Sequence, residues 1–194
     1  MVECLFGGGR GHVGSAMSLI EILRVLYDNF LKYNPNKPND KFRDRLILSK
    51  GHGCLALYAL LADKNFFDKK ILSSASKFNS ILGGHPEYGK VPGVEASTGA
   101  LGHGPAIGVG MAIGAKLNKI NYKTYVIVGD GEINEGSFWE SSMIASKHKL
   151  NNFHLIIDYN KIQSYGKTKE ILDLEPLRKK LDSFGYRVSE VNGH

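Results

Sequence analysis

The stretch Tyr125-Val-Ile-Val-Gly-Asp-Gly-Glu-Ile-Asn-Glu135 decides the fold of this chain, together with a related stretch at Leu155-Ile-Ile-Asp-Tyr-Asn160. Each begins with a short apolar run rich in β-branched residues, which predicts a buried strand, and each run ends at a polar turn. The residues between them show a helical pattern whose apolar side chains share roughly one face: Phe138, Trp139, Met143 and Ile144. Strand, turn, helix and strand together predict a βαβ unit with two parallel strands.

Polar side chains stand where these two strands end. Asp130 follows the first strand and Asn160 follows the second. Because open parallel sheets bind their ligands at the carboxyl ends of the strands, we expect both side chains at one edge of the sheet. An oxygen-only pair suits Mg²⁺, which commonly bridges to phosphate oxygens, and Gly129 and Gly131 allow backbone amides to approach a phosphate closely. The stretch therefore predicts a magnesium-diphosphate site.

Two further segments extend this pattern into an α/β fold. A short strand over 46–48 runs into Gly51-His52-Gly53 and a helix over 55–62. A glycine-rich loop over 98–105 leads into a helix over 106–117, in which glycines alternate with alanines. Such small residues let a helix approach another backbone closely, so we expect this helix to be central and fully buried. The predicted fold class is α/β, with a mostly parallel sheet flanked by helices.

The remaining segments give weaker signals. Ser18, followed three residues later by Glu21, resembles a capping box and predicts a helix that continues to about Lys32. Helical patterns also cover 68–80 and 175–183, with Pro176 at the start of the latter. A polar loop is expected over 161–169, and alternation over 186–191 predicts a final strand.

Composition excludes several classes of function. The 194 residues, 42% of them hydrophobic and 10% aromatic, predict one domain with a buried core. No apolar run is long enough for a transmembrane helix, the first residues lack the pattern of a signal peptide, and Cys4 and Cys54 form no disulfide or metal pattern. A cytoplasmic location is expected. The net charge is +6, but the lysines are scattered, so neither nucleic acid nor a membrane is an expected partner.

The glycine and histidine motifs carry a family resemblance. They occur in the order found in transketolases: Gly11-His12, Gly51-His52-Gly53, Gly84-His85-Pro86-Glu87, Thr98-Gly99-Ala100-Leu101-Gly102, Asp130 to Glu135-Gly136, and Asp158-Tyr159-Asn160. Over nearly its whole length the chain resembles the N-terminal, diphosphate-binding half of transketolase, especially the form that is split into two polypeptides.

The resemblance implies a cofactor, thiamine diphosphate with Mg²⁺, and assigns residues to it. Asp130 and Asn160 would bind Mg²⁺ through side-chain oxygens, and Ile162 would bind it through its backbone carbonyl. Gly131, Asn160 and His52 would hold the diphosphate end of the cofactor. Three residues would line its thiazolium and aminopyrimidine region: Gly99, Ala100 and Leu101.

The resemblance also implies a catalytic set: His12, His52, His85 and Glu135. His12 and His85 would face substrate hydroxyls, and Glu135 would lie at a dimer interface and couple paired sites. The implied reaction moves a two-carbon ketol unit from a ketose, often phosphorylated, to an aldose. Histidines suit the proton transfers of such a reaction near neutral pH.

The length of the chain limits what it can do alone. Residues 1–194 accommodate a single diphosphate-binding domain, expected to be incomplete at both ends, and no pyrimidine-binding domain. The activating glutamate would therefore come from a partner, a C-terminal transketolase subunit, within a homo- or hetero-oligomer. We expect the chain by itself to bind little cofactor and to turn over no sugar phosphate.

Other interpretations remain open at this level. Taken alone, Asp130 fits equally well as a cap of the following helix, and Asn160 as a turn residue. Deoxyxylulose-phosphate synthase and the α subunit of 2-oxo acid dehydrogenases share the core of the motif, although Gly51-His52-Gly53 with His85-Pro86-Glu87 favours transketolase. Further alternatives are a basic binding protein and a non-catalytic assembly subunit.

Overall fold

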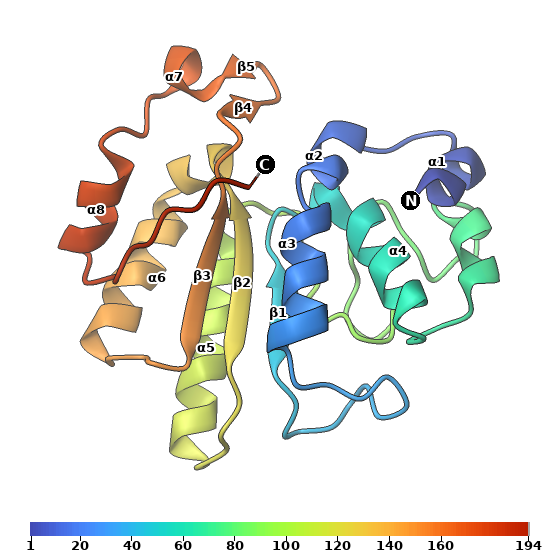
Figure 1. Cartoon of the computed structure of the whole chain (residues 1–194), viewed down its shortest axis with the longest axis horizontal. Helices are drawn as coiled ribbons and strands as arrows, with labels where there is room; N and C mark the ends of the chain where they lie inside the picture. The colour runs from blue at the N-terminus through green and yellow to red at the C-terminus, as the bar shows by residue number, and fades with distance from the viewer. Residues whose placement is uncertain (194) are drawn as a thin grey trace.

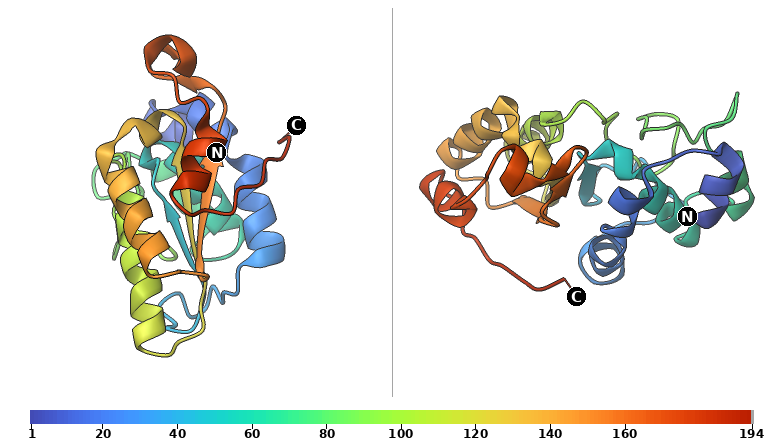
Figure 2. Two further views of the ribbon diagram at one scale, coloured as in Figure 1. Left: turned by 90° about the vertical axis from the view of Figure 1, so that its left-hand side faces the viewer. Right: turned by 90° about the horizontal axis from the view of Figure 1, so that it is seen from above.

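A three-stranded parallel sheet forms the centre of the molecule, with helices packed on both of its faces (Figure 1, Figure 2). The computed structural model describes residues 1–193. The strands are β1 (Arg45–Leu48), β2 (Thr124–Gly129) and β3 (Phe153–Asp158), in the order β1-β2-β3. The predicted α/β class and the parallel pairing of β2 with β3 are confirmed.

The sheet separates two hydrophobic clusters, because successive side chains of a strand point to opposite faces. In β2, Tyr125 and Ile127 belong to one cluster, whereas Val126 and Val128 belong to the other. Residues of β1 divide in the same way. Since both faces are covered, the middle of each strand is mostly apolar, as is typical of parallel sheets.

The N-terminal part of the chain covers one face and forms the first cluster. Its helices are α1 (Val2–Gly8), α2 (Val13–Met17), α3 (Ile20–Val25), a wide π-helical turn η1 (Leu26–Phe30), the 3₁₀ turn η2 (Gly51–Gly53) and α4 (Cys54–Asp63). The fully buried Tyr58 of α4 and Leu23 of α3 lie in this cluster.

The predicted helix that continues to about Lys32 is present as the uninterrupted helical segment of α3 and η1, Ile20–Phe30, but the predicted cap at Ser18 is wrong. The chain is helical before Ser18 and from Ile20 onward, and it widens at η1, where Leu31 N donates to Leu26 O. Ser18 caps no helix, because its hydroxyl donates to Asp158 of β3 at 2.5 Å instead. A distant tertiary contact thus replaced the local capping bond.

Helices on the opposite face form the second cluster. They are α5 (His103–Leu117), the 3₁₀ turn η4 (Gly131–Asn134), α6 (Gly136–Lys147) and α8 (Leu177–Ser183). Helix α5 lies directly on the sheet at Gly108, where an added Cβ would lie 2.4 Å from Val126 Cγ2. The predicted full burial of α5 is nevertheless wrong, because Gly110 and Lys116 are exposed on its other side.

The predicted apolar face of α6 is also only partly correct. Phe138 is completely buried and Trp139 is half-buried, but Met143 and Ile144 are largely exposed. At about 100° per residue, the latter two point away from Phe138. Small residues of α6 face the molecule instead: Ser141, Ser142 and Ala145.

Three predicted elements differ from the structure. The expected helix over 68–80 is a single short 3₁₀ helix, η3 (Lys69–Ser74). The expected loop over 161–169 contains a small hairpin of β4 (Ile162–Gln163) and β5 (Gly166–Lys167), followed by α7 (Thr168–Ile171). The expected strand over 186–191 is irregular chain, anchored where Tyr186 Oη donates to Ser142 Oγ at 3.2 Å.

No helix among residues 1–193 combines the length and apolar character needed to cross a membrane.

Candidate functional site

Asp130 lies at the carboxyl end of β2 and is 2% exposed. Its Oδ1 accepts a hydrogen bond from Gly131 N at 2.7 Å, which fixes the start of η4. Its Oδ2 accepts from Lys161 N at 2.7 Å and from Thr168 Oγ1 at 3.0 Å. Asp130 therefore does begin the following turn, as a capping residue would, and it also holds the hairpin segment against the end of β2.

Asn160 and Ile162 lie in the segment after β3 that contacts Asp130; the βαβ pattern predicted the position of Asn160, and the resemblance alone named Ile162. Lys161, which separates them, makes the backbone contact to Asp130. Asn160 is exposed, and its Oδ1 accepts a hydrogen bond from Ile162 N at 2.9 Å, so it also serves as a turn residue. Within residues 1–193, no three side chains of the His, Cys, Asp and Glu types are grouped to hold a metal ion. The predicted ligands are a set of another kind: one carboxylate, one amide and one backbone carbonyl.

A buried ion pair, which the motifs did not reveal, joins the ends of β1 and β3. Lys50 Nζ lies 2.6 Å from Asp158 Oδ2, and neither side chain is more than 7% exposed. Between the two, the Lys50 side chain passes over Gly129 of β2, where an added Cβ would lie 3.7 Å from Lys50 Cδ. The pair fixes the ends of both strands. Lys50 precedes His52 by two residues, and Asp158 precedes Asn160 by two residues.

Glu132 ties three loops together beneath the same edge. Its Oε1 accepts from Gly102 N at 2.8 Å and from the Ser49 hydroxyl, and its Oε2 accepts from Gly129 N at 3.1 Å. Burial raises the pKa of this carboxyl, although the three donated hydrogen bonds and Lys50 oppose the rise. In the sequence, only its position inside the Asp130 to Glu135 motif drew attention to Glu132.

The three predicted histidines gather at the edge. The rings of His12 and His52 lie 5.4 Å apart in an edge-to-face arrangement. His85 packs against Gly99, where an added Cβ would lie 2.6 Å from His85 Cδ2. The hydroxyl of Tyr58, from α4, donates to His85 O at 2.8 Å and holds that loop in place.

The environment of His52 keeps its ring neutral at physiological pH. Burial lowers the pKa of His52 to about 4, and the positive charge of Lys50 and the neighbouring His12 and His85 contribute to the same shift. The neutral imidazole has one nitrogen that donates and one that accepts a hydrogen bond. His12 and His85 are exposed.

The loop of Gly99, Ala100 and Leu101 lies at the end of β1, because the Thr98 hydroxyl donates to Leu48 O at 2.7 Å. Ala100 is exposed and Leu101 is half-buried. Glu135 is also exposed, at the start of α6. It lies beside the same loop, since a Cβ at Gly102 would lie 2.6 Å from Glu135 Cβ.

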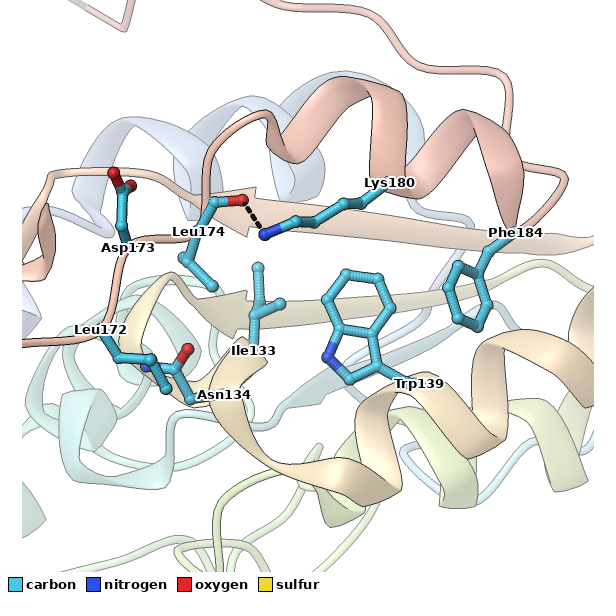
Figure 3. A pocket seen from close by; sticks show the side chains of 8 residues that line it. All are labelled: Ile133, Asn134, Trp139, Leu172, Asp173, Leu174, Lys180 and Phe184. Carbon is cyan, nitrogen blue, oxygen red and sulfur yellow. Dashed lines mark hydrogen bonds between the residues drawn. The ribbon is translucent and has the colours of Figure 1, made fainter.

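A cavity in the described part of the chain lies away from this edge. Its volume is about 360 Å³, and it lies between η4, α6 and α8 (Figure 3). Trp139 and Phe184 form its apolar wall with ring centroids 4.9 Å apart, and Lys180 Nζ donates to Leu174 O at 2.8 Å. None of the predicted site residues lines this cavity.

The structure is an α/β domain whose glycine and histidine loops lie at the carboxyl edge of a parallel sheet, and a family model matches the chain. The family "Transketolase, thiamine diphosphate binding domain" matches residues 4–194. The chain belongs to this family.

Individual relatives place the chain within the family. It is 44% identical over 193 residues to a subunit of the apulose-4-phosphate transketolase of Phocaeicola vulgatus, with 100% of this chain and 68% of the relative covered. It is 41% identical over 186 residues to the 6-deoxy-6-sulfo-D-fructose transketolase subunit SqwG of a Clostridium species, with 96% and 68% covered. The chain thus corresponds to the N-terminal part of transketolase that split forms carry on a separate subunit.

A solved structure supports the same assignment. The transketolase of Leishmania mexicana superimposes with a TM-score of 0.89 at 35% identity, over 97% of this chain. The chain spans 30% of the length of that enzyme.

Proposed function

We propose that this chain is the N-terminal subunit of a transketolase that transfers a two-carbon ketol unit from a ketose to an aldose through thiamine diphosphate and Mg²⁺. The observation that carries the proposal is the meeting of two groups of residues at one sheet edge. Asp130 and Asn160 stand at the ends of β2 and β3, while His12, His52 and His85 gather beyond β1. The buried Lys50–Asp158 pair joins the two groups.

The donor set of this edge fits the proposed metal. Asp130 Oδ1 accepts a hydrogen bond from Gly131 N, and its second lone pair remains for a cation. Asn160 Oδ1 likewise accepts from Ile162 N and keeps a lone pair. Together with the Ile162 carbonyl they form an oxygen-only set, which Mg²⁺ prefers. Gly131, at the start of η4, is placed to hold the diphosphate through its backbone.

Each remaining residue receives a role on this chain. Bound thiamine diphosphate would supply the electron sink for the electron pair released when the substrate carbon–carbon bond breaks. Neutral His52 would donate its ring N–H to an oxygen of the cofactor diphosphate, and Gly99, Ala100 and Leu101 would line the ring region of the cofactor. His12 and His85, which are exposed, would exchange protons with sugar hydroxyls. Glu135 would face a second subunit.

The names of two relatives support a substrate class. One is named for a sugar phosphate and another for a sulfonated fructose, both of which are anionic sugars. We propose that this chain serves a ketose with a terminal phosphate or a similar anion. Its partner would be a pyrimidine-binding C-terminal subunit that completes the site. We place this single diphosphate-binding domain in the cytoplasm, since both cysteines are free thiols.

Co-expression with a pyrimidine-binding partner subunit tests the proposal. The assembly should transfer ketol units between sugar phosphates only when thiamine diphosphate and Mg²⁺ are added. Asp130→Ala and the isosteric Asp130→Asn should both lower activity by at least about a hundredfold, since each removes a charged metal ligand. Asp182→Ala, which changes an exposed aspartate of α8, is the control.

Two results would count against the proposal. One is an assembly of unsubstituted subunits that is inactive across sugar phosphates. The other is full activity of both Asp130 variants when thermal unfolding shows that they are folded.

A further inference from the structure

Glu132 is a buried carboxylate to which the proposed function gives no role. It is 2% exposed and belongs to η4, one residue after Gly131. Burial of a charged carboxylate is costly unless several donors pair with it. Three donors do so here: Gly102 N and the Ser49 hydroxyl on Oε1, and Gly129 N on Oε2. The cost of burying this carboxylate is therefore offset by contacts that join separate segments of the chain.

Each end of this contact set adjoins a segment with a proposed part in cofactor binding. Gly102 directly follows residues 99–101, the ring loop, which would line the rings of the cofactor. Gly129 begins residues 129–131, the diphosphate turn, and Glu132 comes directly after them. One side chain thus links the ring end of the proposed site to its diphosphate end.

The ring loop is anchored at both of its ends. At its start, the Thr98 hydroxyl donates to Leu48 O of β1 at 2.7 Å. At its end, Gly102 N donates to Glu132 Oε1 at 2.8 Å. Gly102 has a φ of 79°, and a Cβ there would lie 2.5 Å from Ser137 Oγ, so the backbone packs closely on α6 at this point. The hydrogen bond to Glu132 therefore forms in a tightly packed place, where a small change in the reach of the acceptor matters.

We propose that Glu132 is a positioning residue that holds the ring loop at a fixed distance from the diphosphate turn through its hydrogen bond from Gly102. The inference rests on the proposed function and adds to it a group that acts through these two segments. A cofactor that spans both segments is aligned for reaction only if they keep their separation, and a displacement of about 1 Å can cost about a hundredfold in rate. This role depends on the reach of the side chain and not on its charge.

Two conservative substitutions separate reach from charge. Glu132→Asp keeps the charge but withdraws the carboxylate from Gly102 by one methylene group. Glu132→Gln removes the charge but keeps the reach, so its oxygen can still accept from Gly102 and Ser49. With the partner subunit, Mg²⁺ and saturating thiamine diphosphate, the kcat of ketol transfer should fall about ten- to a hundredfold in Glu132→Asp and less than about threefold in Glu132→Gln. Glu190→Asp, the same shortening at a side chain that is 70% exposed, is the control.

Two readouts other than activity locate the defect. Inorganic pyrophosphate with Mg²⁺ reports on the diphosphate end alone, so in calorimetric titration Glu132→Asp should bind it within about threefold of the parent affinity, whereas thiamine diphosphate should bind about tenfold more weakly. Without ligand, the Gly102 amide should exchange its hydrogen at least about tenfold faster in Glu132→Asp than in the parent chain or in Glu132→Gln, because its acceptor has been withdrawn.

The outcomes are distinguishable. Parent-like kcat of Glu132→Asp, or an equal loss of kcat in Glu132→Gln, overturns the positioning role and leaves the proposed function intact. Equal losses of affinity for pyrophosphate and thiamine diphosphate, or failure of Glu132→Asp to fold, give Glu132 a general structural role and also overturn it. If the unsubstituted assembly binds no thiamine diphosphate, the proposed function fails and the positioning role fails with it.

Discussion

At the scale of single residues, the charged groups beneath the sheet edge matter as much as those expected to bind ligands. Lys50 and Asp158 meet across β2, and Ser18 adds a hydroxyl to the same carboxylate oxygen. Removal of one partner from a buried ion pair leaves an uncompensated charge, which is far more costly than the loss of an exposed pair. The pair therefore orders the edge before any ligand binds.

Substitution of Lys50 tests this role. Lys50→Met should lower the free energy of unfolding by about 3–5 kcal/mol, because Asp158 stays buried without its counter-ion. Lys69→Met removes an exposed pair with Asp63, at 3.0 Å, and should cost less than about 1 kcal/mol. Urea unfolding of both variants measures the two losses of unfolding free energy. Equal losses would show that the buried pair stabilises the fold no more than the exposed pair does.

The protonation of His52 gives a second test. Its resonance in an NMR titration should move with a midpoint near 4, well below the ordinary histidine pKa of about 6.5. In Lys50→Met the midpoint should rise, because a positive charge near the ring is lost. Since the folded-state pKa lies below the unfolded one, the contribution of His52 to stability is intact above about pH 6.5 and is lost as the pH falls toward 4. A midpoint near 6.5 in the parent protein would contradict the buried environment.

At the scale of elements, local sequence patterns predicted the strands and helices that are marked by an apolar run or by a glycine turn. The strands β1, β2 and β3 were predicted within one or two residues, because apolar runs and polar turns mark their ends. Helix α5 was placed correctly, but its open side was not foreseen, since glycine and alanine occur both in tight packing and on exposed faces. The hairpin of β4 and β5 was missed because its polar residues give no alternating pattern.

Two glycines of α5 form a matched pair for mutagenesis. Gly110→Ala should stabilise the chain by roughly 0.5–1 kcal/mol, because no atom lies within 4 Å of the new Cβ and alanine favours the helix. Gly108→Ala gains the same propensity but forces its Cβ to 2.4 Å from Val126, so it should destabilise by about 1–3 kcal/mol. Thermal unfolding of the two variants compares them directly, and shifts of the same sign would refute the packing of α5 on β2.

At the scale of the whole molecule, the predicted site is an open edge. His12, His85, Ala100 and Glu135 are all exposed there, and the 360 Å³ cavity lies away from them between α6 and α8. Ligand sites usually enclose most of their ligand's surface. An exposed edge of this kind fits a cofactor that a second polypeptide covers.

Thermodynamic linkage between cofactor binding and subunit association tests whether the two polypeptides share the site. The chain alone should bind thiamine diphosphate with Mg²⁺ at least about tenfold more weakly than the chain with its pyrimidine-binding partner. By reciprocity, the cofactor should tighten the association of the two subunits by the same factor. Calorimetry gives the first ratio and analytical ultracentrifugation the second. Tight binding by the isolated chain, or an association of the two polypeptides that is independent of the cofactor, would contradict a shared site.

The sequence by itself determined the α/β class, the parallel pairing of β2 with β3 and the family, because strand periodicity, glycine turns and histidine motifs are local in the chain. It also placed Asp130, Asn160 and His52 after strands, where parallel topology brings them together. Only the tertiary structure decided which groups hold that edge: the Lys50–Asp158 pair and the three loops on Glu132. Apart from the local contact of Gly129 with Glu132, these contacts join residues from 30 to more than 100 positions apart, and no local pattern encodes such a pairing.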